Sequence, residues 1–134
     1  FALQLSDRQE LMFYRLRRDG GAADPHSRGV IVDSRGEVRS LPATVQITAT
    51  AQWSSPHSGV RYPAAWKVSV PAEGWSLTVT PYIADQELNY RFRYWEGAVH
   101  VAGMIGERSV QGDGYVELVG YTGPISAQPD SPRD

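Results

Sequence analysis

The sequence contains no cysteine in its 134 residues. Disulfide bridges, thiolate-bound metals and a cysteine nucleophile are therefore excluded. Lysine is almost as scarce, because Lys67 is the single lysine and the other twelve basic residues are arginines. Arginine binds carboxylates in bidentate fashion, but a GC-rich coding genome produces the same bias, and we favour that explanation. No apolar run approaches the roughly 20 residues of a membrane-spanning helix.

What is present is the composition of an ordinary globular domain. Hydrophobic residues make up 41% and charged residues 21%, and the net charge of −2 gives no overall attraction to nucleic acid or to anionic lipid. The chain opens directly on Phe1-Ala2-Leu3-Gln4-Leu5, a strand-like stretch without an initiator methionine. We therefore expect a fragment of a longer polypeptide, whose targeting signals would lie upstream.

Apolar and polar residues alternate along most of the chain, which is the pattern of β-strands. The clearest case runs from Thr44 to Trp53, where Val45, Ile47, Ala49, Ala51 and Trp53 share one face. Nine short strands and no helix are predicted. Their expected ranges are 2–6, 10–17, 29–33, 37–41, 44–53, 66–70, 75–80, 94–105 and 114–121.

The connections carry residues that favour turns. Asp33-Ser34-Arg35-Gly36 and Pro71-Ala72-Glu73-Gly74 are expected to be tight hairpin turns, with glycine supplying the positive φ. Residues 18–28 and 54–63 are expected to form longer loops. The segment 122–134 is rich in proline and lacks apolar alternation, so it is expected to be a flexible tail.

Many short strands with hairpin turns predict an all-β fold, either a closed antiparallel barrel or a sandwich. We favour the barrel, because closing a sheet of eight or more strands removes its exposed edges. Gly97, Gly103 and Gly106 lie in or beside the strand at 94–105 and suit the bends of a barrel wall.

Two stretches near the end of the chain support a more specific assignment. They are Tyr94-Trp95-Glu96-Gly97-Ala98-Val99-His100-Val101-Ala102-Gly103 and Gly112-Asp113-Gly114-Tyr115-Val116-Glu117-Leu118-Val119-Gly120-Tyr121. Together they resemble the closing strands of the carotenoid hydratase/AttH-like family of lipocalin-like proteins. Asp85-Gln86-Glu87-Leu88, the opening Phe1–Leu5 and the segment Glu10–Arg15 are similar to that family too. One departure is Val119, where the family pattern has threonine.

The resemblance implies an antiparallel lipocalin-like (calycin) β-barrel of about eight to ten strands over residues 1–121. It implies a protein of two such barrels, of which this would be the second, so the missing N-terminal barrel is an expected partner. Family members include cofactor-independent hydratases that add water to a carotenoid double bond. The implied ligand is a hydrophobic small molecule of isoprenoid, carotenoid or lipid-like type, and no cofactor is implied.

Two alternatives accompany that function. Related proteins are pericyclases of natural-product synthesis, and others are non-catalytic cell-envelope proteins associated with ABC transporters. The second alternative would add membrane or transporter association, and it favours the periplasm or cell envelope over the cytoplasm. If the reaction pocket lies in the missing barrel or between the two, this chain alone is not the active enzyme.

Glu96 and Glu117 are the leading candidates for catalytic carboxylates. Strand alternation places Trp95, Val99 and Val101 inward, so Glu96 and His100 should point outward, and Glu117 should share that outer face if its strand pairs with theirs. The functional interpretation is an acid/base pair in a crevice shared with the missing domain. The structural alternative, which we favour, is solvation or pairing with Arg91, Arg93 or Arg108.

Asp85 is a third candidate acid, because it follows a predicted strand end where a carboxylate could orient a ligand hydroxyl or protonate an alkene. The alternative for Asp85 and Glu87 is a loop cap that accepts backbone N–H groups. The three histidines are scattered without metal-site spacing, so no metal is expected, and Gly112-Asp113-Gly114 is expected to be a turn. The four tryptophans have inward predicted positions, where they either line a ligand cavity or fill the barrel. These are Trp53, Trp66, Trp75 and Trp95.

Overall fold

The computed structural model describes residues 1–41 and 45–122. In them the chain forms ten antiparallel strands and one short 3₁₀ turn, η1 (Pro71–Glu73). No helix in this part of the chain is long and apolar enough to cross a membrane. The strands are β1 (Ala2–Leu5), β2 (Glu10–Tyr14), β3 (Arg28–Val32), β4 (Val38–Leu41), β5 (Gln46–Ser54), β6 (Arg61–Val70), β7 (Trp75–Pro81), β8 (Glu87–Asn89), β9 (Arg93–Ile105) and β10 (Arg108–Leu118).

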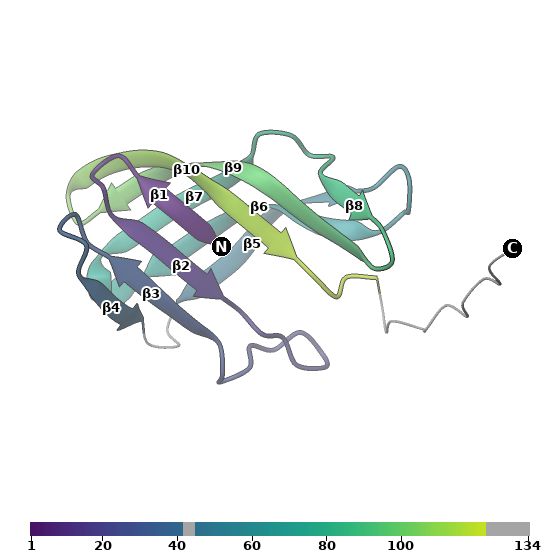
Figure 1. Ribbon diagram of the computed structural model, residues 1–134, viewed down its shortest axis with the longest axis horizontal. Coiled ribbons are helices and arrows are strands. Elements are labelled where there is room, and N and C mark those ends of the chain that lie inside the picture. Colours follow the sequence, from purple (N-terminus) through teal and green to yellow (C-terminus); the bar gives the residue numbers. More distant parts are fainter. Residues whose placement is uncertain (42–44, 123–134) are drawn as a thin grey trace, which may run out of the picture.

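All ten strands belong to one sheet, which excludes the sandwich alternative for the described residues. Its order is β4-β3-β2-β1-β10-β9-β7-β6-β5, and β8 adds to β9 beside this path. The sheet curls so that β2–β4 lie across from β5–β7 (Figure 1). The ladder ends at β4 on one side and β5 on the other, and the described parts of these two strands do not pair. The architecture is therefore a half-barrel with one open seam.

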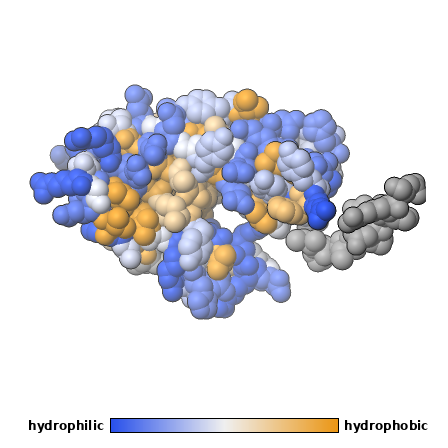
Figure 2. Space-filling model, viewed as in Figure 1, coloured by the Kyte–Doolittle hydropathy of each residue, from blue (hydrophilic) through white to orange (hydrophobic). Residues whose placement is uncertain are grey.

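The inward residues of the strands form a single core. Val70, Val79, Val99, Val101 and Val116 have no exposed surface. This burial follows the alternation of the sequence, because neighbouring residues of a strand point to opposite faces of the sheet. On the face of the molecule shown in Figure 2, apolar residues lie in patches among polar ones.

The predicted turns at Asp33–Gly36 and Pro71–Gly74 are confirmed. The N–H of Gly36 donates to the carbonyl of Asp33 at 3.0 Å, and that of Gly74 donates to the carbonyl of Pro71 at 3.1 Å. Both glycines have positive φ, 86° and 69°. Strand bounds differ more: β6 begins at Arg61 inside the predicted loop, and β8 is a short strand that the alternation does not reveal.

The predicted turn at Gly112-Asp113-Gly114 is wrong, because these residues lie inside β10. Gly112 stands opposite Leu5, and Gly114 stands opposite Leu3. A Cβ atom at Gly112 would overlap the backbone carbonyl of Gln4. The glycines are therefore needed for the close approach of β1 to β10 and not for a change of chain direction.

The strand predicted most clearly from the sequence, at residues 44–53, corresponds to β5, and its expected inner face is only partly buried. Val45 is buried and Ile47 and Trp53 are half-buried, but Ala49 and Ala51 are exposed. β5 is an edge strand, and its pairing with β6 shifts register around Ala51. Alternation indicates which residues share a face, whereas burial also requires something to cover that face. Thr44 and most of the expected tail, from residue 123 onward, lie outside the described residues.

Candidate functional site

A buried carboxylate lies at one end of the half-barrel, where the loop between β5 and β6 meets the segment between β7 and β9. Glu87 stands opposite Trp95 in the β8–β9 ladder, so its side chain points to the inner face. Only 1% of that side chain is exposed. A buried charge is stable only when it is paired or hydrogen-bonded.

Three hydroxyl groups satisfy this carboxylate. Ser55 Oγ donates to Glu87 Oε2 at 2.6 Å, and Ser58 Oγ donates to Oε1 at 2.6 Å. The phenol of Tyr62 donates to Oε1 at 3.0 Å. The guanidinium of Arg93 lies 3.9 Å from Oε1 and adds an opposite charge.

Burial and hydrogen bonding act on the Glu87 pKa in opposite directions. Burial alone would raise the pKa, but the hydrogen bonds from Ser55, Ser58 and Tyr62, together with the charge of Arg93, lower it below the ordinary value. Burial and then the bond to Glu87 raise the pKa of Tyr62 to about 12. Glu87 is therefore an anion at neutral pH, and Tyr62 is a neutral hydrogen-bond donor.

Glu87 also holds the β5–β6 loop in place. The backbone N–H groups of His57 and Ser58 each donate to Ser55 Oγ at 3.2 Å, and that same hydroxyl donates to Glu87. The loop is thus capped by Ser55, and Ser55 is bound to the carboxylate. Among the residues that the structure describes, Glu87 accepts hydroxyl groups and no backbone N–H group, so the direct loop cap expected for this residue is not found there.

The anchored loop carries a histidine that pairs with a predicted site residue. His57 Nε2 lies 3.1 Å from Asp85 Oδ2. Both side chains are accessible, with 66% of His57 and 44% of Asp85 exposed. A histidine paired with a carboxylate can exchange protons with a ligand.

An aromatic surface adjoins Glu87 through Tyr62. The rings of Trp53 and Tyr62 stack with centroids 6.2 Å apart, and Tyr121 packs on Tyr62 at 5.7 Å. The guanidinium of Arg17 lies 3.8 Å above the Tyr121 ring. We call Trp53, Tyr62 and Tyr121 the mouth aromatics.

Glu96 and Glu117 lie away from this site, on the outer face of the sheet. They stand directly opposite each other in the β9–β10 ladder. His100 is on the same face, opposite Asp113, so the expected grouping of Glu96, His100 and Glu117 on one outer face is confirmed. Burial and then the charges of Glu96 and Glu117 raise the pKa of Tyr94.

The arginines expected to pair with Glu96 and Glu117 do not form those ion pairs in the described structure. Arg93 lies beside Glu87, and Arg108 lies 3.4 Å from Asp7. Within the described residues, neither Glu96 nor Glu117 has an ion pair with an arginine or lysine. The structural alternative for Glu96 and Glu117 is solvation or pairing with an arginine, and of these two only solvation agrees with the described residues.

Three of the four tryptophans lie in the core. Trp66, Trp75 and Trp95 are at most 2% exposed. Trp66 and Trp95 pack against each other with ring centroids 6.3 Å apart, and the indole N–H of Trp95 donates to the carbonyl of Ala84 at 2.8 Å. Trp53 is the exception, because it is half-buried among the mouth aromatics.

The role of Glu87 as the central carboxylate was missed, although the sequence contains a signal. The loop Ser54-Ser55-Pro56-His57-Ser58 is rich in hydroxyl groups, and Asp85 and Glu87 are two residues apart. That spacing on an extended segment sends both carboxylates to one side. Within residues 1–41 and 45–122, no group of three histidine, aspartate or glutamate side chains is placed to hold a metal ion.

Comparisons with known proteins agree with the all-β fold. The profile of a family described as AttH-like matches residues 1–121. A crystal structure of a protein assigned as an AttH from Nitrosomonas europaea superposes with a TM-score of 0.73 at 28% identity, covering 90% of this chain and 37% of that one. Kievitone hydratase from Nectria haematococca superposes with a TM-score of 0.70 at 24% identity, covering 88% and 38%.

The chain therefore spans less than two-fifths of either solved structure. The search of curated proteins found no match. The expected fold, an antiparallel lipocalin-like barrel, is confirmed, with the qualification that the described sheet is open at one seam.

Proposed function

Because the chain belongs to the AttH-like family, we propose that it binds an apolar small molecule at the mouth aromatics, as part of a cofactor-independent hydratase. The ligand class is isoprenoid, carotenoid or lipid-like. The observation that carries the proposal is the buried Glu87, which fixes both the phenol of Tyr62 and the loop that bears His57. A solved hydratase with the same fold supports the reaction class.

The proposed chemistry is the addition of water across a carbon–carbon double bond. His57 gives a proton to one alkene carbon, and the oxygen of a water molecule bonds to the other carbon. The protonated alcohol formed in this step returns one proton to His57, which restores the starting state. Asp85 Oδ2, 3.1 Å from His57 Nε2, orients the imidazole.

The mouth aromatics have a separate task in this proposal. Aromatic rings present a negative face that attracts cations. Positive charge that develops on the alkene during protonation would be stabilised by the face of Trp53, because the Tyr121 ring already lies under the guanidinium of Arg17. Tyr62 between them is held in place by its hydrogen bond to Glu87.

Glu96 and Glu117 form a second candidate acid pair in this proposal. They are opposite each other on the outer face, so they would reach a substrate only where another domain covers that face. The remaining length of the relatives is consistent with such a domain. In a protein of that length, His57→Asn and Glu96→Gln separate the two sites, because only the variant at the working site loses turnover.

Ligand binding is tested by titrating the chain with all-trans-retinol and following tryptophan fluorescence. We expect saturable quenching, with binding about tenfold weaker in Trp53→Leu because a large aromatic contact is lost. Tyr90→Leu is the matched control, since Tyr90 is exposed and outside the mouth. Absence of a saturable change in the unaltered chain would refute binding.

Turnover is tested separately by mass spectrometry, after incubation of geranylgeraniol in ¹⁸O-water. Incorporated label that disappears in His57→Asn supports the hydratase. Binding without any label supports the non-catalytic alternative.

A further inference from the structure

The open seam of the half-barrel contains a cleft that the proposed function does not use. It has a volume of about 300 Å³ and lies between the end of β2, the segment 23–27 and the first half of β5. We call it the seam cleft. Small-molecule sites begin at about 300 Å³, so the seam cleft can hold part of a ligand.

The floor of the seam cleft is apolar and continuous with the core. Phe13 and Val45 line it and are only 2% and 8% exposed, and Ile47 lines it and is half-buried. Apolar surface of this kind gains stability when it is removed from water, about 25 cal/mol per Å². Phe13 and Val45 are already shielded by the fold, so a hydrocarbon chain in the cleft would mainly cover the exposed part of Ile47.

The side chain of Arg15 extends across the seam cleft to β5. The guanidinium of Arg15 donates from Nη1 to the carbonyl oxygen of Ile47 at 3.0 Å. It forms no ion pair with a carboxylate of the described residues. Because a guanidinium carries five N–H donors in a planar fork, Arg15 keeps donors for a ligand.

The backbone of β5 adds a further donor at the same place. The N–H and C=O of one residue in an antiparallel strand point to the same side. Since the carbonyl of Ile47 faces Arg15 across the seam, the N–H of Ile47 faces the seam as well. Arg15 and Ile47 together present the donors that a carboxylate accepts.

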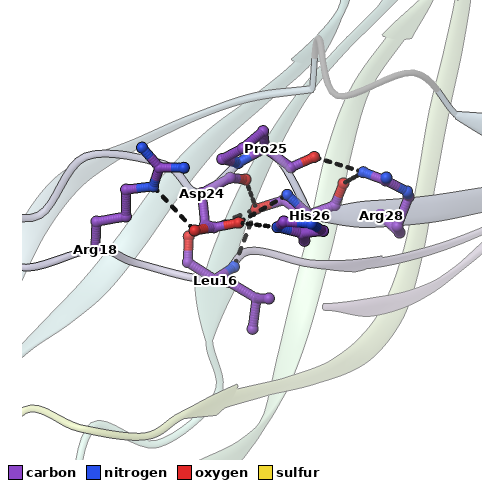
Figure 3. Close-up of polar contacts among 7 residues, drawn as sticks. Leu16, Arg18, Asp24, Pro25, His26 and Arg28 are labelled. Carbon is purple, nitrogen blue, oxygen red and sulfur yellow. Dashed lines mark hydrogen bonds and ion pairs between the residues drawn. The ribbon is translucent and has the colours of Figure 1, made fainter.

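The one carboxylate that lines the seam cleft is already occupied. Asp24 Oδ2 accepts Arg18 Nε at 2.9 Å, and Asp24 Oδ1 accepts the backbone N–H of His26 at 2.8 Å, with the His26 ring at the same distance (Figure 3). The hydrogen bond from the His26 backbone, followed by those from Arg18 and the His26 ring, holds the Asp24 pKa well below its usual range. The Asp24 carboxylate is therefore already bound by Arg18 and His26, and it does not neutralise Arg15.

The wall around Asp24 is held in a fixed shape. Buried Ser27 donates to the carbonyl of Asp24 at 2.7 Å and accepts the N–H of Leu16 at 3.1 Å. Arg28 donates to the carbonyl of Pro25 at 2.6 Å (Figure 3). The seam cleft thus has one preformed polar wall, an apolar floor and the guanidinium of Arg15, which has no carboxylate partner among the described residues.

We propose that the seam cleft binds the carboxylate of an apolar acid, such as a fatty or isoprenoid acid. The carboxylate lies on Arg15 and the N–H of Ile47, and the hydrocarbon chain covers Ile47 and rests against the edges of Phe13 and Val45 that line the cleft. The proposal rests on the proposed function, because it narrows the apolar ligand to one with an acidic end and gives that end a position.

The test measures binding of radiolabelled oleate and oleyl alcohol to the 134-residue chain by equilibrium dialysis. The two ligands share a hydrocarbon chain and differ in charge. We expect oleate to bind at least about tenfold more tightly, because charge-assisted hydrogen bonds exceed neutral ones. Arg15→Gln should abolish this preference, while Arg35→Gln, at an exposed turn, should preserve it.

A second pair of variants tests the location without altering charge. Thr48 lines the seam cleft, whereas Thr50 is exposed two residues further along β5 and is not part of the lining. Thr48→Phe should fill the cleft and weaken both ligands about tenfold, and Thr50→Phe should not. Circular dichroism melting identifies any variant that fails to fold. If Arg15→Gln fails to fold, the Thr48 and Thr50 variants still test the location of the site.

The outcomes separate the two proposals. Equal binding of oleate and oleyl alcohol, a preference that survives in Arg15→Gln, or binding unaffected by Thr48→Phe would overturn the seam cleft and leave the mouth proposal standing. Failure of both ligands and of retinol to bind would overturn both proposals.

Discussion

At the scale of single residues, Glu87 shows how a buried charge can organise its surroundings. Its carboxylate is 1% exposed and accepts three hydroxyl groups. Replacing the carboxylate leaves some of the hydroxyl donors of Ser55, Ser58 and Tyr62 without an acceptor oxygen. The cost of such a change exceeds the net value of the hydrogen bonds, because unsatisfied buried groups also lose their hydration.

We expect Glu87→Gln to lower the free energy of unfolding by about 1–3 kcal/mol. The amide replaces one acceptor oxygen with a donor, which then faces a serine hydroxyl. Urea denaturation measures the loss. Glu107→Gln, at an exposed turn, is the control and should change stability very little; equal losses in the two variants would contradict the anchoring role.

The same residue predicts a pH dependence. The folded pKa of Glu87 is lower than its ordinary value of 4.5, so the unfolded chain binds more protons in the interval between the two pKa values. Its contribution to stability is complete above about pH 4.5 and is lost as the pH falls through the folded value.

Denaturation curves of the unaltered chain and Glu87→Gln should therefore converge as the pH is lowered below 4.5. Asp24 and Asp33 also have lowered pKa values, but they are present in both proteins and cancel in the difference. A constant difference from pH 7 down to pH 2 would show that Glu87 is not the titrating group.

At the scale of strands, the sequence predicted where most strands lie better than it predicted what packs around them. Alternation located β5, β7 and β9 because a period of two survives any tertiary context. It did not predict β6 from Arg61, since Pro63 argues against a strand. The structure places Pro63 opposite Gln52, next to the irregular register of β5, where proline's missing N–H is tolerated.

The candidate site was less predictable than the strands. Asp85 was found by its position after a strand end, and the outer position of Glu96 and Glu117 followed from alternation. The burial of Glu87 depends on Ser55, Ser58 and Tyr62, which come from another hairpin. No local pattern encodes which hairpins meet at the end of a curled sheet.

The pairing of β1 with β10 predicts the effect of Gly112→Ala. The added Cβ would overlap the carbonyl of Gln4, so β1 must move away from the sheet. We expect a loss of about 1–3 kcal/mol in unfolding free energy, which is typical of overpacking. Gln111→Ala on the exposed neighbouring position is the control, and thermal melting compares the two. Unchanged stability in Gly112→Ala would contradict the close packing.

At the scale of the whole molecule, β9 is the interior strand with the most pairing partners. It pairs with β10, β7 and β8, whereas β4 and β5 each have one neighbour in the described ladder. Amide groups of a central strand exchange only when much of the fold opens, but those of an edge exchange through local fraying.

Native-state hydrogen exchange should therefore be slowest in β9 and fastest in β4. Within β5, the amides that point to β6 should exchange more slowly than those that point to the open seam. The measurement is residue-resolved exchange by NMR. Protection of the seam-facing amides of β5 equal to that of β9 would indicate that the seam is closed in solution.

The position of β10 between β1 and β9 also constrains how the protein is made. β1 to β4 form one meander and β5 to β9 form another group, and in the ladder only β10 joins them. A ribosome finishes both groups before it delivers the strand that connects them. Such long-range pairing slows folding, so during synthesis the free edges of β1 and β9 are the surfaces that a chaperone would need to shield.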